Sequence, residues 1–523
     1  MTRERVWVCG VGLLCLALLA TWIPHYLTWP WFRDLDTFAT IAQSWDAGIR
    51  PYRDIEAYNF PGQTYLLWLL GKSIGWGHTA PFYVLDVVLV FALGAALAIW
   101  SRRCFATLLP GTIAYLVFLT QYLNLDYSQV AQRDWQATLF VVLSLITLQS
   151  GNSRRGRALS AILFACGLTF RPHVVLFLPA IWVALSGGVS AGTGPSRARA
   201  VAEWSGVFGL AALLAFAPLL LAGVTPDFVR GLHLAIASGA YGANSPAQAA
   251  ETLLEQLGMK WTIAALAIGP LFSTYGPAQW RRFGGTWTWA MIAAFIYRPV
   301  HPQPHQYLLL PLDLIAAINV ALLVAWLHGS PRSGAAREIG VLAIVLLSLV
   351  PLPQFCSVEQ SMQALAFAFS AAEPEKPPAG SHQWLHAGRQ AGGYAWSNYR
   401  DALAYLRTRT GATTVVANLL RRYPFPAMNG PAGRLSPFLA ESGICWMLLV
   451  NQDLDAVFAE SLTRARQSVV VWSPGESGVE PRMGLPRVIA VVRREYELVE
   501  RFGQIEIWKR RENSAIPGET ARP

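Results

Sequence analysis

Apolar runs of about 20 residues recur along most of this chain, and they constrain its fold more than any other feature. A run of that length crosses the hydrocarbon core of a bilayer as one α-helix. Of the 523 residues, 54% are hydrophobic and 14% are charged, whereas a soluble protein carries about 25% charged residues. The pattern therefore predicts a polytopic α-helical membrane protein rather than a soluble one.

The net charge of +10 does not indicate a nucleic-acid-binding protein, because the basic residues form short clusters between the apolar runs. Six such clusters are expected on the cytoplasmic side by the positive-inside rule, namely 1–5, 101–103, 153–157, 196–199, 280–282 and 331–337. We expect about eleven spans with the N-terminus inside and the C-terminus outside. The expected spans are 6–28 (uncleaved), 82–100, 105–123, 134–150, 158–170, 173–187, 202–222, 260–277, 286–297, 307–328 and 338–353.

A segment rich in carboxylates follows the first apolar run, and we expect it outside the membrane. It contains Asp34, Asp36, Asp54 and Glu56. Carboxylates are costly to place near hydrocarbon, so their presence there usually marks catalysis or transport. This outer loop, about residues 30–80, is the first place to look for chemistry.

Part of that loop is expected to form an amphipathic helix in the plane of the membrane surface. Phe38, Ile41, Ala42 and Trp45 recur at helical spacing, with polar residues on the other face. Asp36 would stand near the start of this helix, where a carboxylate either caps the helix or takes part in chemistry. Both interpretations stay open.

Further polar residues fall at the predicted outer ends of later spans. Arg133 and Asp134 begin the fourth span, Arg171 separates two short apolar runs, and Arg298 and His305 precede the tenth span. A carboxylate can deprotonate an acceptor, and arginines can hold a phosphate leaving group. Each feature also has a structural interpretation: an ion pair at a helix start, a contact with lipid headgroups, or interfacial histidines.

A possible metal site and a possible disulfide remain open on sequence grounds. His301 and His305 resemble a metal pair, but the intervening prolines deny them helical i,i+4 spacing. Cys356 and Cys445 are the cysteines expected outside the membrane, where either a disulfide or two free thiols is possible.

The composition changes after the last apolar run. Residues 1–353 form the expected membrane domain, 354–380 a linker rich in Ala, Glu and Pro, and 512–523 a disordered tail. From 381 to 511, helical patterns alternate with short apolar strands, which predicts a small extracytoplasmic α/β domain. The expected strands and helices there are helix 401–411, strand 413–420, strand 443–451, helix 455–467, strand 468–473 and hairpin 496–511.

The first outer loop resembles that of the GT-C superfamily of membrane glycosyltransferases, in particular the bacterial branch related to protein O-mannosyltransferases and aminoarabinose transferases. The similar features, in order, are Asp34, Gly48, the string Pro51–Asp54, Pro61-Gly62, and the run Tyr65–Leu67. The resemblance extends over about residues 7–325, through Arg-Asp at 133–134 and HQYLLLPL at 305–312.

This resemblance implies transfer of a sugar, with inversion, from a polyprenyl phosphate to an envelope acceptor. It assigns Asp34 as the general base, and Arg171, Arg298 and His305 to the donor phosphate. The candidates for binding acceptor or metal are Asp36, Asp54, Glu56, Arg133 and Asp134. No cofactor is certain, because some relatives use a divalent metal and others do not. The implied partners are the lipid-linked sugar and membrane lipids, in the bacterial cytoplasmic membrane with the site outside.

Two other classes of protein fit the sequence less well. O-antigen polymerases and ligases also use outer Arg and His residues, but their large outer loop lies between late spans. Transporters place coupling acids at the membrane midplane, often in repeated halves. Here the acids follow the first span and no internal repeat is visible.

Overall fold

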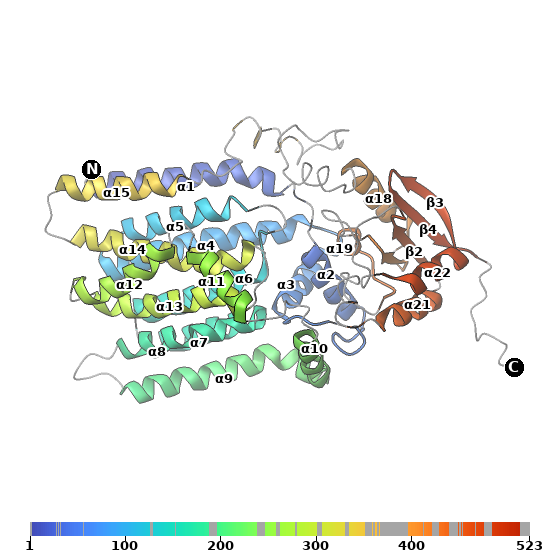
Figure 1. Cartoon of the computed structure of the whole chain (residues 1–523), viewed down its shortest axis with the longest axis horizontal. Coiled ribbons are helices and arrows are strands. Elements are labelled where there is room, and N and C mark those ends of the chain that lie inside the picture. Colours follow the sequence, from blue (N-terminus) through green and yellow to red (C-terminus); the bar gives the residue numbers. More distant parts are fainter. Residues whose placement is uncertain are drawn as a thin grey trace.

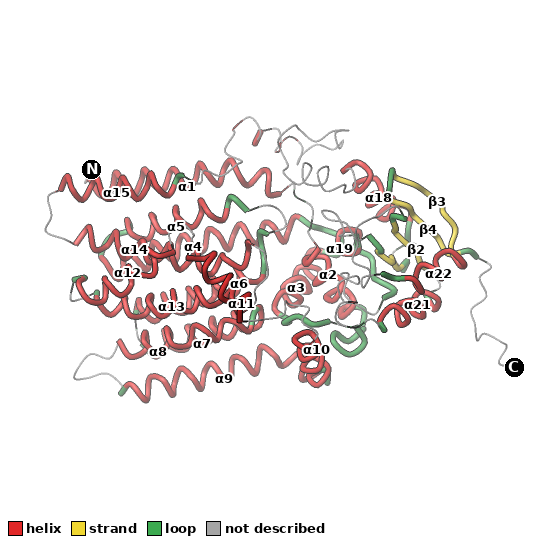
Figure 2. The backbone as a smooth tube through the Cα atoms, viewed as in Figure 1, coloured by secondary structure: helices red, strands yellow, loops and turns green. Residues whose placement is uncertain are grey.

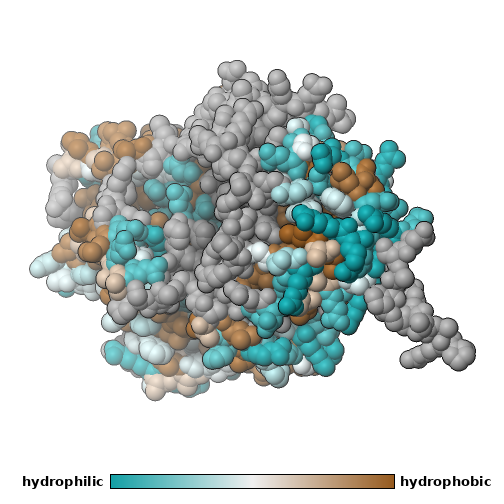
Figure 3. All heavy atoms as spheres, turned by 45° about the vertical axis from the view of Figure 1, so that its right-hand side comes forward, coloured by the Kyte–Doolittle hydropathy of each residue, from teal (hydrophilic) through white to brown (hydrophobic). Residues whose placement is uncertain are grey.

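The structure is a computed structural model in which one half is a helical bundle and the other a small sheet with helices (Figures 1 and 2). It describes residues 3–27, 29, 31, 33–55, 57–125, 129–151, 153–187, 196–237, 246–257, 262–277, 280–300, 306–329, 334–350, 358, 361–362, 364, 366, 396–411, 413–420, 428–438, 448, 451, 453–465, 467–474 and 484–512. Hydrophilic residues gather over the sheet half, and hydrophobic residues are frequent on the surface of the bundle (Figure 3).

A helix occupies each range that the sequence predicts to span the membrane. These helices are α1 (Arg3–Leu27), α4 (Ala80–Phe105), α5 (Leu109–Tyr122), α6 (Arg133–Ser150), α7 (Arg154–Phe170), α8 (Leu178–Gly187), α9 (Arg197–Leu221), α12 (Thr262–Tyr275), α13 (Arg281–Val300), α14 (Leu310–Gly329) and α15 (Gly334–Ser348). Two 3-10 turns, η1 (Pro172–Phe177) and η2 (Gln306–Leu309), lead into α8 and α14.

Four segments in the described part of the chain are long and apolar enough to cross a membrane. They are α1, α4, α9 and the continuous segment Gln306–Gly329, and two shorter apolar segments are Pro172–Ser186 and Thr262–Tyr275. The chain is therefore a helical membrane protein, whereas eleven crossings remain a prediction.

Ion pairs formed by residues of the basic clusters lie at the end of the bundle away from the sheet. Arg3 pairs with Glu338 at 3.1 Å, and Glu203 accepts hydrogen bonds from both Arg157 and Arg199. The first loop and the sheet lie together at the opposite end (Figure 1). By the positive-inside rule, the end with the basic clusters is expected to be cytoplasmic.

The sheet has four strands in the order β1-β2-β4-β3. β1 (Val415–Asn418) is parallel to β2 (Ser468–Trp472), while β4 (Ile505–Arg510) is antiparallel to both β2 and β3 (Tyr496–Phe502). The accompanying helices are α18 (Trp396–Arg409), α19 (Asn429–Ala432), α21 (Leu454–Arg464) and α22 (Pro486–Glu495). The strands at 413–420 and 468–473, helices 401–411 and 455–467, and the terminal hairpin were all predicted, whereas α22 was not.

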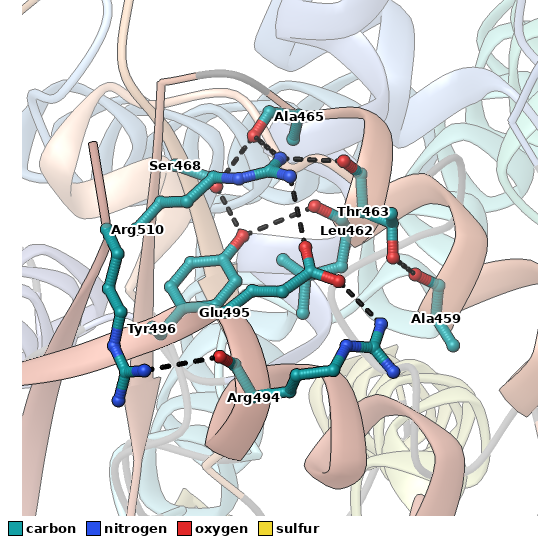
Figure 4. Close-up of polar contacts among 10 residues, drawn as sticks. Ala459, Leu462, Thr463, Ala465, Ser468, Arg494, Glu495, Tyr496 and Arg510 are labelled. Atoms are coloured by element: carbon teal, nitrogen blue, oxygen red, sulfur yellow. Dashed lines mark hydrogen bonds and ion pairs between the residues drawn. The ribbon is translucent and has the colours of Figure 1, made fainter. Parts of the chain in front are cut away.

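A buried polar cluster joins the helices of this α/β domain to its sheet (Figure 4). Glu495, at the end of α22, pairs with Arg510 of β4 at 3.0 Å. Arg510 also donates to the carbonyl oxygen of Ala465, 2.8 Å away, and the hydroxyls of Tyr496 and Ser468 lie 2.5 Å apart. These contacts connect the end of α21, the start of β2 and the α22–β3 joint.

Between the two halves lies α2 (Arg33–Asp46), which forms where the sequence predicts an amphipathic helix, but its polar face is covered by protein. The polar side chains of Thr37, Thr40 and Ser44 are buried along with the apolar ones. α19 of the α/β domain packs on α2 and covers that face. The helix is therefore an internal element of the junction.

The other expectations for this end of the chain fall mostly outside the described residues. These are the linker 354–380, the tail, most of strand 443–451, and both Cys356 and Cys445. Among the described residues, Cys9, Cys15, Cys104 and Cys166 are free thiols.

The predicted topology can be tested with reporter fusions on either side of the bundle. We expect a fusion at Gly156, beside a basic cluster, to report the cytoplasm, and a fusion at Ser397, in α18, to report the outside. Alkaline phosphatase and fluorescent-protein reporters distinguish the two sides. Reports of the same side from both fusions would contradict the assignment.

Candidate active site

A buried ion pair lies where three helices meet beneath the first loop. The Arg171 Nη2 lies 2.7 Å from Oδ2 of Asp134, and the two residues are 6% and 0% exposed. The hydroxyl of Tyr297 donates to the other Asp134 oxygen at 2.8 Å. The site thus joins the first turn of α6, the end of α7 and α13, and both carboxylate oxygens of Asp134 are engaged.

The neighbouring Arg133 connects this pair to the first loop. Its Nη1 donates to Oδ1 of Asn59 at 2.7 Å, and its guanidinium lies 4.5 Å from the centre of the Phe38 ring. A cation over an aromatic face is attracted by the ring quadrupole. Phe38 belongs to α2, so Arg133 holds α2 and the loop against α6.

Tyr307, in the 3-10 turn before α14, is the common neighbour of the charged groups. Asp34, Arg171, Asp134 and Arg133 all interact electrostatically with its hydroxyl. The backbone N–H of Tyr307 donates to Gln129 at 3.1 Å, which fixes the turn. The four charged residues named from sequence are therefore grouped around one tyrosine.

Asp34 differs from Asp134 in its hydrogen bonds and ion pairs. It lies in the first turn of α2, is half-buried, and forms no hydrogen bond or ion pair with any part of the chain that the structure describes. Its carboxylate is thus available to a substrate.

Asp36 lies two residues further along α2, about 200° around the helix from Asp34. It is 1% exposed and accepts backbone hydrogen bonds from Met428 at 3.3 Å and Gly430 at 2.5 Å. A Cβ on Gly430 would come within 3.0 Å of Ala39 and of the Asp36 carboxylate, so only glycine fits this contact. Asp36 therefore holds the α/β domain against α2, a role that neither sequence interpretation included.

The remaining sequence candidates lie elsewhere or outside the described residues. Asp54 forms an i,i+4 ion pair with Arg50 at 3.0 Å, and hydrogen bonds from Arg50 hold the pKa of Asp54 below its usual value. Arg298 pairs with Glu255 at 3.1 Å. The structure does not describe Glu56, His301 and His305.

The described acids of the first loop do not fit a shared metal site. Asp34 and Asp36 point to different sides of α2, and Asp54 is occupied by Arg50. Across the described ranges, no group of three or more His, Cys, Asp or Glu side chains could hold a metal ion.

Sequence reasoning missed the tyrosines and the asparagine of this site. Tyr297 immediately precedes Arg298, and one residue is about 100° of helix rotation, which turns the tyrosine instead of the arginine toward Asp134. Tyr307 lies within the HQYLLLPL motif. Asn59 gave no signal, because its partner is 74 residues away in the sequence.

A fully buried carboxylate below the ion pair was also missed. Asp86 of α4 accepts hydrogen bonds from the Tyr26 hydroxyl at 2.8 Å, the Tyr122 hydroxyl at 2.5 Å and the Trp135 indole at 2.9 Å. Trp135 adjoins Asp134, and the Tyr122 hydroxyl also accepts from the backbone N–H of Ala131 at 3.1 Å. Asp86 therefore positions the segment that carries Arg133 and Asp134.

The Pro-Gly of the first loop has a steric role beside Arg171. α3 (Gly62–Ile74) begins at Gly62, where a Cβ would lie 2.7 Å from Oγ1 of Thr169 and 2.9 Å from the backbone nitrogen of Phe170. Such distances require the backbone at the end of α7 to move. Gly62 therefore lets the first loop lie directly on the turn that presents Arg171.

Comparison with known proteins gives one informative result. No protein-family model matches the chain, and no curated protein matches it by sequence. Among solved structures, the chain is similar to ArnT from Cupriavidus metallidurans in the apo state. The TM-score is 0.55 and the identity 13%, over 97% of this chain and 98% of that one. The likeness shows that the chain has an ArnT-like fold over the part that is matched.

Replacing Gly62 tests the steric contact at the site. We expect Gly62→Ala to displace the turn at Arg171 and to destabilise the protein by about 1–3 kcal/mol, because a side chain forced into a packed contact requires the backbone to move. Gly206→Ala is a matched control, since a Cβ at Gly206 meets nothing within 4 Å. Equal thermal unfolding midpoints of the two variants would show that the close approach does not constrain the turn at Arg171.

Proposed function

We propose that this protein is a membrane glycosyltransferase of the GT-C type that transfers a sugar from a polyprenyl phosphate to an envelope acceptor. The reaction takes place at the outer face of the bacterial cytoplasmic membrane and inverts the anomeric carbon. Asp34 is the general base, and Arg171 binds the donor phosphate. The observation that carries the proposal is the Asp34 carboxylate, which has no hydrogen bond or ion pair with the described residues and is grouped with the buried Arg133 and Arg171.

The choice of Asp34 as base follows from the state of the two nearby carboxylates. Asp134 has both oxygens engaged, by Arg171 and by Tyr297, so neither oxygen is available to accept a proton from an acceptor group. Asp34 has no such partner and is half-buried. Of the two, only Asp34 is free to take a proton from an acceptor hydroxyl or amine.

Unused polar atoms support binding of a substrate at the same place. The Arg171 Nε is buried without a hydrogen-bond partner among the described residues, so its N–H can donate to a phosphate oxygen. The amide oxygens of Gln63 and Gln136 are also buried without such partners, and as acceptors they suit a hydroxyl or N–H group of a substrate. Gln63 adjoins the Gly62 contact, and Gln136 lies one turn after Arg133 in α6. Buried polar atoms without partners are rare in folded proteins, so these indicate a substrate that supplies partners.

The two arginines of the cluster suit a phosphate leaving group. The charges of Arg133 and Arg171 balance those of Asp134 and Asp34. Guanidinium N–H groups that are held in place stabilise a phosphate as it leaves, because negative charge develops on it in the transition state. The Tyr307 hydroxyl lies within electrostatic range of all four charged groups.

The fold is consistent with this function and with the location. The ArnT-like fold supports a membrane glycosyltransferase, whose donor would be a lipid-linked sugar. The α/β domain and first loop share one end of the bundle (Figure 1). With the basic clusters inside, that end and the site face outward.

Asp34→Asn tests the general base directly. The amide keeps the size of the side chain but cannot take a proton, so we expect kcat to fall by about 100-fold or more. The measurement is sugar transfer from polyprenyl-phosphate sugars by purified protein in vesicles. Asp227→Asn is a control, because Asp227 forms a surface pair with Arg230. Full activity of Asp34→Asn with loss in Asp54→Asn would transfer the role to Asp54.

Arg171→Lys tests the phosphate contact while keeping a cation opposite Asp134. Lysine cannot reproduce the planar fork of arginine, so we expect the donor KM to rise by about tenfold, the equivalent of ~1.4 kcal/mol. Arg157→Lys is the matched control, because Arg157 is a buried arginine paired with Glu203 at the other end of the bundle. An unchanged donor KM in Arg171→Lys would remove Arg171 from donor binding.

A further inference from the structure

A groove with polar residues in its lining lies at the junction of the two halves, away from the candidate active site. It has a volume of about 490 Å³ and lies between the α3–α4 connection and the α/β domain. The residues that line it are Ile74, Trp76, Gly77, His78, Thr79, Ala80, Pro81, Arg407, Ala432 and Arg434. We call it the junction groove.

The charged residues of the junction groove are all basic. Arg407 donates to the carbonyl oxygens of Pro431 at 2.9 Å and Gly77 at 3.3 Å, and Arg434 donates to oxygens at the end of α18. None of these acceptors carries a formal charge, and no Asp or Glu is among the described residues that line the groove. Asp46, which lies outside the groove, accepts a hydrogen bond from the indole N–H of Trp76. The charge of Asp46 is balanced by Lys72, whose ammonium nitrogen lies 2.6 Å from its carboxylate. The groove therefore has an uncompensated positive charge.

An apolar stripe continues from the groove along a membrane span. Ala80, which lines the groove, is the first residue of α4. Val84, Val88 and Phe91 follow it at helical spacing, and all three are exposed. α4 is long and apolar enough to cross a membrane, so its first turn belongs at the level of the lipid headgroups. A molecule with an anionic head and hydrocarbon chains fits the basic groove with its head and the apolar stripe of α4 with its chains.

The groove is separate from the donor site. A narrow crevice next to it reaches Ala39 of α2 and Gly430, on the face of the helix that Asp36 occupies. Asp34 lies about 200° around α2 from Asp36, and it is within electrostatic range of Tyr307. A lipid in the groove is thus on the far side of α2 from the reacting groups.

We propose that the junction groove binds the phosphate of an anionic phospholipid, with the acyl chains along α4, and that this lipid stabilises the docking of the α/β domain. Its headgroup lies beside Arg407, the residue that bridges Gly77 of the membrane half and Pro431 of the α/β domain. The proposal concerns a lipid that is neither donor nor acceptor, and it does not depend on the proposed reaction.

The test measures binding of phosphatidylglycerol to the purified full chain by native mass spectrometry, together with the thermal unfolding midpoint. We expect phosphatidylglycerol to bind and raise the midpoint, and phosphatidylcholine and inorganic phosphate to do neither. Arg407→Gln should weaken phosphatidylglycerol binding about fivefold, as expected for one cation near an anionic headgroup. Arg409→Gln is the matched control, because Arg409 is exposed on the same helix but does not line the groove.

A second variant decides the test if Arg407→Gln does not fold. Ala80→Glu adds a negative charge to the groove, while a carboxylate at the start of a helix favours folding of α4. We expect it to bind phosphatidylglycerol about fivefold more weakly with an unchanged midpoint in phosphatidylcholine. Unchanged phosphatidylglycerol binding in Ala80→Glu, equal binding of phosphatidylcholine, or an equal effect of inorganic phosphate would each overturn the proposal.

Discussion

The ion pair between Asp134 and Arg171 costs free energy to bury, and much of the surrounding structure serves to hold it. Taking two charges out of water is expensive, and their attraction offsets this only when the geometry is good and other hydrogen bonds complete it. Tyr297 supplies one such bond. Asp86, through Trp135, fixes the segment that presents Asp134. Because hydrophobic replacements of buried ion pairs are often no less stable, the cost of this pair is in keeping with the proposed role of Arg171 in donor binding.

The junction between the two halves gives adjacent carboxylates different tasks. Asp36 faces the α/β domain, where it accepts two backbone hydrogen bonds, whereas Asp34 lies about 200° around the helix from it. The position of α2, and hence of Asp34, therefore depends on a segment almost 400 residues further along the chain. The α/β domain is part of the scaffold of the candidate site even though none of its described residues lies among the charged cluster.

Features that depend on residues close together in the sequence could be predicted, and features that depend on distant residues could not. The apolar runs and the alternating strands of the α/β domain are local patterns, and most of the expected helices and strands are present among the described residues. The helix α22 was missed because only Val488, Val491 and Val492 mark its buried face within ten residues. The burial of α2 was missed because its cover, α19, comes from a distant segment.

In the candidate site, likewise, conspicuous charged residues were predicted, whereas their partners from distant segments were not. Sequence reasoning selected Arg133, Asp134 and Arg171 because charges at span ends are conspicuous, and the structure groups them. It chose Arg298 instead of Tyr297, because a pattern of charges does not reveal which face of a helix turns inward. Asp86 was overlooked as one acid inside an apolar run, since its three donors are contributed by three different helices.

The most direct test of the central claim is a cryo-EM structure of the protein with polyprenyl phosphate bound. The account predicts phosphate density about 2.7–2.9 Å from the guanidinium of Arg171, the usual length of a charge-assisted hydrogen bond. The anomeric position of a sugar on that phosphate should then face Asp34. Phosphate density held by Arg298, or by the junction groove, with Arg171 still bound only to Asp134, would contradict the account.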